Sequence, residues 1–140
     1  MQDDRQEADP SDPDVAIVLD AYEAFARGDI DASVTYLHPQ VEWEEPVEFP
    51  NGGRRQGPDA VAAYLRGARA MWASLRSEPT VYRHRGNLVV LHHASGWLID
   101  GTEHEVTVAD VYTFSDGVVV RMHAYANPDD AFRSSLNEER

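Results

Sequence analysis

The chain has 140 residues, and its 42% hydrophobic and 9% aromatic content is enough to bury the core of a single domain. Its 25 acidic residues exceed its 12 basic residues, so the formal net charge is −13, which disfavours nucleic acid and anionic membrane surfaces as partners. The chain contains no cysteine, which excludes disulfides, thiolate metal sites and a cysteine nucleophile.

The first twelve residues are acidic and poor in apolar side chains, so we expect a disordered tail over residues 1–12. One α+β domain is then expected over residues 13–133, followed by a short C-terminal tail over residues 134–140. The N-terminal residues lack the apolar segment of a signal peptide, and no apolar run is long enough to cross a bilayer. We therefore expect a soluble, cytoplasmic protein.

Two helices are predicted after this tail. Asp12 can cap the first, which begins with Pro13 and ends at Gly28. Asp29 can cap a second, which stops before Pro39 because the residue preceding a proline avoids the helical region. The apolar stripe of the first helix comprises Val15, Val18, Leu19, Tyr22, Phe25 and Ala26, and that of the second comprises Ile30, Val34 and Leu37.

A strand is predicted over residues 41–50, and it places an acid among apolar residues. Val41, Trp43, Glu45 and Val47 share one parity, and in an extended chain each parity faces one side. Glu45 is therefore predicted to point inward, where a carboxylate must be paired, protonated or functional. The alternatives are a structural hydrogen bond, or a bulge near Pro46 that turns Glu45 outward.

A third helix is predicted to begin at Gly57 and Pro58, after a loop rich in proline, glycine and asparagine over residues 50–53. We expect this loop, together with Arg54 and Arg55, to be solvated over the mouth of a pocket. The apolar stripe of the third helix comprises Val61, Tyr64, Leu65, Ala68, Trp72 and Leu75.

Residues 80–126 favour four antiparallel strands, separated by turn signals near residues 86, 101 and 117. Three helices followed by a long, curling sheet indicate an α+β fold, in which the helices cover one face and the sheet bends around a central cavity.

A second acid lies in an apolar phase, because Asp110 alternates in step with Val106, Val108, Tyr112 and Phe114. Its alternative role is a structural bridge to a pocket donor such as His93. Over residues 88–99 both phases are partly apolar, and His93 shares its phase with Trp97. We therefore predict that His93 faces the pocket.

The stretches that carry a family resemblance are AYEAFARGDIDASVTYLHPQVEWEEP, GPDAVAAYL and ADVYTFSDGVVVRMHAY. Over about residues 14–132 the chain resembles the nuclear transport factor 2-like superfamily and its SnoaL-like branch, with ketosteroid isomerases as distant relatives. The resemblance implies a cone-shaped α+β barrel with three N-terminal helices on a curved, mixed or antiparallel sheet. It also implies a homodimer that forms through the outer sheet face.

The same resemblance suggests roles for both buried acids. Glu45, in EEPV, matches the proton-shuttling aspartate of the ketosteroid isomerases, and Asp110, in VADVYTF, matches their protonated oxyanion-hole aspartate. Their hydrogen-bonding tyrosine corresponds to Ala21, one residue before Tyr22. Because one residue rotates a helical side chain by roughly 100°, we do not assign that role to Tyr22.

Other kinds of site receive little support. The histidines have no paired carboxylates or metal-binding spacing, so neither a metal nor another cofactor is predicted. Ser95 lacks the glycine-flanked turn of a catalytic serine, and Gly52 and Gly53 lack the remainder of a phosphate-binding loop.

The sequence thus predicts a small apolar or aromatic ligand, of polyketide or steroid-like size. Glu45 would be the general base, and Asp110 the general acid or oxyanion donor, of a cofactor-independent isomerase or cyclase. The competing hypothesis is a non-catalytic binding or dimerising module, because one fold hosts both classes. The predicted ligand-binding residues are Trp43, Tyr64, His93, Trp97, Tyr112 and Met122.

Overall fold

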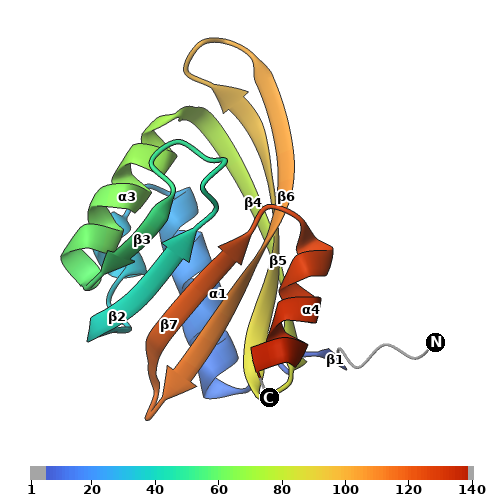
Figure 1. The fold of residues 1–140 in the computed structure, drawn as a ribbon. Helices are drawn as coiled ribbons and strands as arrows, with labels where there is room; N and C mark the ends of the chain where they lie inside the picture. The colour runs from blue at the N-terminus through green and yellow to red at the C-terminus, as the bar shows by residue number, and fades with distance from the viewer. Residues whose placement is uncertain (1–5, 139–140) are drawn as a thin grey trace.

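The computed structural model describes residues 6–138, which form a curved seven-stranded sheet with helices on both faces (Figure 1). The strands lie in the order β1-β4-β5-β6-β7-β2-β3, and every neighbouring pair is antiparallel except β2 with β7, which is parallel. The predicted α+β class with a curved, mixed sheet is confirmed. No helix in the described range is long and apolar enough to span a membrane.

The N-terminal part contains the three predicted helices, with shorter second and third members. The helices are α1 (Pro13–Ala26), α2 (Ile30–Ser33) and α3 (Pro58–Ala70). The carboxylate of Asp12 accepts the backbone N–H of Asp14 at 2.9 Å and so caps α1, as predicted. Asp29 likewise accepts the N–H of Ala32 at 3.1 Å and caps α2.

The third helix ends earlier than its apolar stripe predicts. Trp72 and Leu75 belong to β4 (Trp72–His84), which pairs with β5 (Asn87–Leu98) along its length. The side chain of Arg69 holds the junction, because its Nε donates to the carbonyl of Ala26 and its Nη1 to that of Trp72, both at 3.1 Å. Strand pairing therefore overrides the helical periodicity after Ala70.

The strand that carries Glu45 begins and ends earlier than predicted. It is β2 (Leu37–Glu45), so Leu37 lies in this strand and not in the second helix. The predicted loop after Gly52 contains β3 (Gly53–Gln56), which pairs antiparallel with β2. The remaining long strands, β6 (Glu103–Ser115) and β7 (Val118–Tyr125), complete the predicted meander.

The predicted tails also contain regular structure. Gln6–Glu7 forms β1 against β4, so the expected disorder is wrong for this part of residues 1–12, while residues 1–5 lie outside the described range. Pro128–Glu138 forms α4, which continues beyond the predicted domain end at residue 133. Its first turn contains two acidic residues, Asp129 and Asp130, which suit the positive end of a helix.

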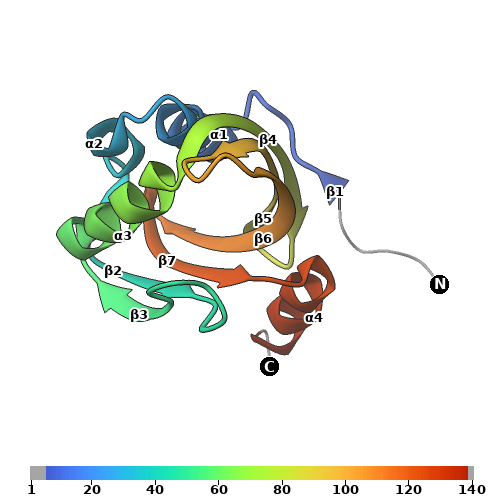
Figure 2. The same cartoon turned by 90° about the horizontal axis from the view of Figure 1, so that it is seen from above.

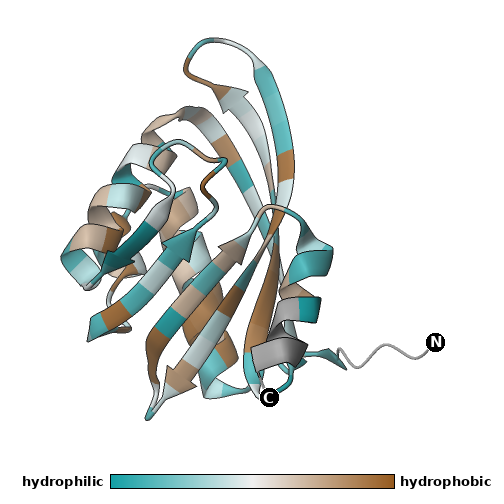
Figure 3. Cartoon of the chain, in the orientation of Figure 1, coloured by the Kyte–Doolittle hydropathy of each residue, from teal (hydrophilic) through white to brown (hydrophobic). Residues whose placement is uncertain are grey.

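Two cores lie on opposite faces of the sheet, and the curvature is visible from above (Figure 2). The concave face packs on α1 through Val15, Val18, Val41, Leu88 and Met122, and the cavity described below opens beside this core. The convex face packs on α4 through Val89, Ala109, Val111, Ala131 and Phe132. The β5–β6 hairpin extends beyond these two layers and carries hydrophilic segments (Figure 3).

Candidate active site

A cavity of about 200 Å³ lies between the concave face of the sheet and the helices α1 and α3. Its wall is largely aromatic, and a flat, mainly apolar ligand suits such a wall. The volume is below the ~300–1,000 Å³ of pockets that hold drug-sized ligands, which favours a compact ligand. The aromatic lining residues include Phe25, Trp43, Phe49, Tyr64, Trp72 and Tyr112.

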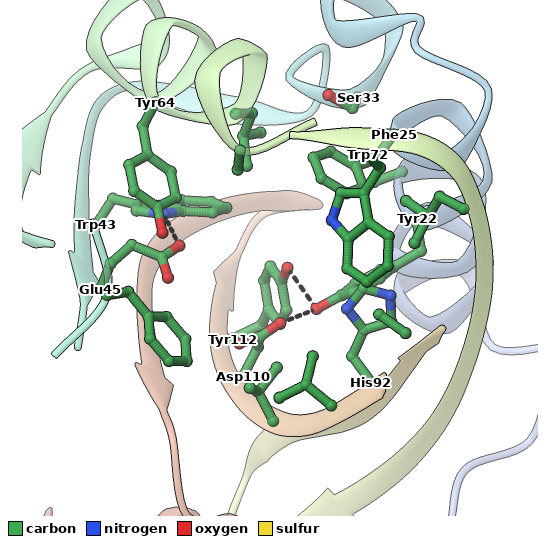
Figure 4. A pocket seen from close by; sticks show the side chains of 18 residues that line it. Tyr22, Phe25, Ser33, Trp43, Glu45, Tyr64, Trp72, His92, Asp110 and Tyr112 are labelled. Carbon is green, nitrogen blue, oxygen red and sulfur yellow. Dashed lines mark hydrogen bonds between the residues drawn. The ribbon is translucent and has the colours of Figure 1, made fainter. Parts of the chain in front are cut away.

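Glu45, the last residue of β2, points into this cavity (Figure 4). Its Oε2 accepts a hydrogen bond of 2.7 Å from the indole Nε1 of Trp43, and the hydroxyl of Tyr64 lies beside it. Burial and the negative charge of Asp110 raise the pKa of Glu45 to about 8, although the Trp43 and Tyr64 donors oppose the rise. This carboxyl therefore retains a proton at neutral pH.

Asp110, from the middle of β6, enters the cavity beside a chain of two tyrosine hydroxyls. Tyr22 of α1 donates to Oδ2 of Asp110, and Tyr112 donates to the Tyr22 hydroxyl oxygen at 2.9 Å. Burial raises the pKa of Asp110 to about 6, and the hydrogen bond from Tyr22 limits the rise. The hydrogen bond from Tyr22 thus favours the ionised form of Asp110.

The two carboxyl groups act as an electrostatically coupled pair, because each sits in a poorly hydrated space near the other. No lysine or arginine of the described chain lines the cavity. Arg55, whose guanidinium carbon lies 4.2 Å from the ring centre of Tyr64, acts to lower the pKa of Glu45. At neutral pH the pair can hold a single proton, which provides an acid and a base together.

Of the two adjacent histidines on β5, the one that lines the cavity is His92. Its Nε2 lies 2.7 Å from Oγ of Ser77, and its ring meets that of Tyr22 edge-on with centroids 4.8 Å apart. Burial, followed by the nearby His93, lowers the pKa of His92 to about 4. The imidazole is therefore neutral at physiological pH.

The prediction that His93 faces the cavity is wrong, because its side chain lies on the convex face. There it contacts Thr107 through Nδ1 and Glu105 through Nε2, each at 2.8 Å. Both phases of β5 carry apolar residues because α4 covers part of the convex face, including Val89. Apolar neighbours therefore could not identify the inner phase.

Two further predicted ligand residues lie outside the cavity. Trp97, near the end of β5, is 50% exposed and shares the convex phase of His93. Met122 points to the concave side, but it is 1% exposed and is packed into the core beside the cavity. Trp43, Tyr64 and Tyr112, by contrast, line the cavity together with both carboxyls.

Within residues 6–138 there is no group of three histidine or acidic side chains arranged to hold a metal ion.

A family model of the SnoaL-like domain matches residues 18–122, about three quarters of the chain. The chain belongs to the SnoaL-like domain family. Both carboxyls, Tyr22 and His92 fall within the matched part of this SnoaL-like domain. Among curated proteins the comparison found no match to this chain.

Solved structures support the fold of the SnoaL-like domain. An NTF2-like protein of unknown function from Burkholderia pseudomallei is 25% identical, with a TM-score of 0.72 over 86% of this chain and 95% of that one. TerC, co-crystallised with polyporic acid, is 22% identical with a TM-score of 0.69, covering 89% and 98%. A putative isomerase from Bacillus subtilis is 17% identical with a TM-score of 0.69, covering 91% and 97%.

Sequence reasoning missed several residues of the SnoaL-like cavity. The sequence does not assign to Tyr22 the role of the hydrogen-bonding tyrosine, because that tyrosine corresponds to Ala21. In the structure, however, the hydroxyl of Tyr22 donates a hydrogen bond to Asp110. Ala21 lines the cavity beside it, so this part of α1 presents two consecutive residues to the space. The position of Tyr22 in the apolar stripe of the first helix could have indicated that its side chain points inward. To place Trp72 and His92 at the cavity, by contrast, one must know how β4, β5 and β6 pair.

Proposed function

We propose that this protein is a cofactor-independent isomerase or cyclase that moves protons on a compact, apolar ketone in the cavity. The observation that carries the proposal is the pair of enclosed carboxyls whose pKa values are both raised and differ from each other. Titratable groups with separated pKa values in a dry pocket can supply an acid and a base at the same pH. The aromatic wall supports a flat ligand with one or two rings.

The order of the pKa values favours exchanging the roles predicted from the sequence. Asp110, as carboxylate, removes a proton from the carbon next to the carbonyl, while Glu45 donates its proton to the carbonyl oxygen. With a β,γ-unsaturated ketone, the dienol formed then takes the proton from Asp110 at the γ-carbon and returns the oxygen proton to Glu45, so that the carbon–carbon double bond moves into conjugation. Both carboxyls recover their initial states, and no oxidant or other reactant is required.

The comparisons support the proposal only at a coarse level. One similar structure is described as a putative isomerase, and another, TerC, was co-crystallised with polyporic acid. Both are less than 25% identical to this chain, so the substrate must be identified by experiment. The homodimer implied by the resemblance also stays a proposal, which analytical ultracentrifugation would test.

The test compares Glu45→Gln with Asp110→Asn in binding and turnover assays on a panel of cyclic enones and polyketide-like ketones. Both variants should still bind ligand, and we expect Asp110→Asn to reduce turnover by about 100-fold or more. Glu45→Gln should lose less, because glutamine resembles the protonated carboxyl and keeps an acceptor for Trp43.

Glu44→Gln is the matched control, since Glu44 lies next to Glu45 but contacts Arg54 on the convex side at 3.3 Å. Its turnover should equal that of the unaltered protein. If Asp110→Asn retains full turnover, the proposed chemistry is wrong. Ligand binding without turnover of any ketone would instead identify a non-catalytic binding module.

A further inference from the structure

His92 lies beyond the carboxyl pair along the cavity wall. Asp110 of β6 is paired with Val90 of β5, so His92 is its diagonal neighbour on the same face of the sheet. Diagonal neighbours on antiparallel strands have their Cβ atoms about 7 Å apart, roughly the width of one ring system. In Figure 4 Asp110 lies between Glu45 and His92, so the polar groups are arranged along one direction.

One nitrogen of His92 is fixed by protein and the other is available. Nε2 is engaged by the hydroxyl of Ser77 at 2.7 Å. Nδ1 has no hydrogen-bond partner among the described residues, yet it is not among their fully enclosed polar atoms without a partner. Because His92 is only 9% exposed and lines the cavity, the accessible surface of Nδ1 is expected to open into that space.

We propose that His92 determines ligand specificity by hydrogen-bonding a second oxygen of the ligand, opposite the end that meets the carboxyl pair. The ligand class is thus a planar, neutral, doubly oxygenated ring compound, with a ketone or enol at one end and a hydroxyl or second carbonyl at the other. This inference rests on the proposed function, because it assumes that the cavity binds the ligand and that the carboxyls contact its reactive end.

The surroundings of His92 favour a neutral partner. Because burial keeps the pKa of His92 low, the imidazole carries no charge with which to bind an anionic group. The edge-on contact with Tyr22 and the bond to Ser77 fix the ring from two sides. When the Ser77 hydroxyl donates to Nε2, the ring proton resides on Nδ1 and points toward the ligand; in the other tautomer Nδ1 accepts.

The inference is tested with two probes of the same shape, 2-naphthol and 2,6-dihydroxynaphthalene, by isothermal titration calorimetry on the whole chain. A neutral hydrogen bond corresponds to an affinity ratio of about 3–10 in favour of the dihydroxy compound. His92→Phe keeps an aromatic ring against Tyr22 and should bring the ratio to about 1. His93→Asn, the matched control on the convex face, should leave the ratio unchanged.

Equal affinities of the unaltered protein for the two probes, or an unchanged ratio in His92→Phe, would overturn the inference. If His92→Phe does not fold, the inference is tested instead by the NMR chemical shifts of the His92 ring ¹⁵N atoms in the unaltered protein. The Nδ1 resonance should shift when 2,6-dihydroxynaphthalene binds and much less with 2-naphthol, and equal shifts contradict the proposal. Failure of both naphthols to bind also overturns it, whereas the proposed function is judged separately by ketone turnover in Asp110→Asn.

Discussion

The concave and convex faces of the sheet place the same types of side chain in opposite surroundings. On the convex face Glu105 is paired with His93 at 2.8 Å and Glu44 with Arg54 at 3.3 Å. On the concave face Glu45 and Asp110 share a cavity whose described lining contains no lysine or arginine. The raised pKa values of Glu45 and Asp110 thus result from the face on which these residues lie and not from the residue type.

The comparison also explains why neighbouring residues differ so strongly. Glu44 and Glu45 are consecutive, as are His92 and His93, and a strand turns each pair toward opposite sides. The convex member meets water and an opposite charge, while the concave member meets aromatic rings. Substitutions on one face should therefore change proton transfer, and those on the other should change almost nothing.

After Asp110→Asn itself, the largest effect is expected for Tyr22→Phe, which removes the donor to Asp110. The pKa of Asp110 should rise, so the acidic limb of the pH–turnover profile should move to higher pH and turnover should fall by about 10- to 100-fold. Tyr82→Phe is the control, because Tyr82 packs against Phe132 on the convex side. An unchanged acidic limb in Tyr22→Phe would show that this hydroxyl does not tune Asp110.

The next largest effect is expected for Glu45→Gln, and it is a change in the free energy of unfolding. The raised pKa of Glu45 means that the folded state keeps a proton that the unfolded state releases above pH about 4.5. The contribution of Glu45 to the free energy of unfolding should therefore be fully present below pH about 4.5 and be lost as pH rises to about 8. Glu45→Gln cannot ionise, so it should be more stable than the unaltered protein at pH 8 by about 1–3 kcal/mol.

Urea denaturation at pH 5 and pH 8, followed by circular dichroism, measures this difference. Glu44→Gln provides the comparison from the convex face and should keep the original pH dependence. If Glu45→Gln has the same pH dependence as the unaltered protein, Glu45 is not enclosed as described.

A smaller effect is expected for Trp43→Phe, which keeps a buried ring but loses the N–H donor to Glu45. The pKa of Glu45 should rise further, moving the alkaline limb of the pH–turnover profile to higher pH. The smaller ring and lost hydrogen bond should lower stability by about 1–2 kcal/mol. Stability loss without movement of the limb would mean that Trp43 acts only through packing.

The smallest effect is expected for Glu105→Gln, which changes an exposed contact of 2.8 Å between Glu105 and His93 on the convex face. Exposed pairs contribute about 0–1 kcal/mol, so stability should change by no more than about 0.5 kcal/mol and turnover should stay constant. Thermal unfolding and the ketone assay test this together. A tenfold loss of turnover would remove the functional distinction between the two faces.

Strand alternation carried most of the information that the sequence held about the site. The parity of residues 106–114 correctly directed Asp110 inward, and the parity of residues 41–47 did the same for Glu45. These strands bury one face at the relevant positions, so apolar residues mark a single side. On β5 both faces are partly covered, and the same reasoning assigned the wrong histidine to the cavity.

Elements that depend on distant partners were harder to predict. β3 is a short strand whose residues, including Arg54 and Arg55, have a polar composition and become regular only through pairing with β2. The helical spacing of Trp72 and Leu75 was overruled by their pairing with β5. The hydrogen bond between Tyr22 and Asp110 likewise depends on how α1 is placed against β6, which periodicity alone does not determine.

The single parallel contact of the sheet has a consequence for how the molecule assembles. Trp43 of β2 is paired with Met122 of β7, and these strands lie far apart in the chain, whereas β4 to β7 form by successive hairpins. Closing a long loop is slow relative to forming a hairpin. Asp110 is thus expected to occupy an early-forming meander and Glu45 to join it late, so proton-transfer competence should appear only in the final stage of refolding.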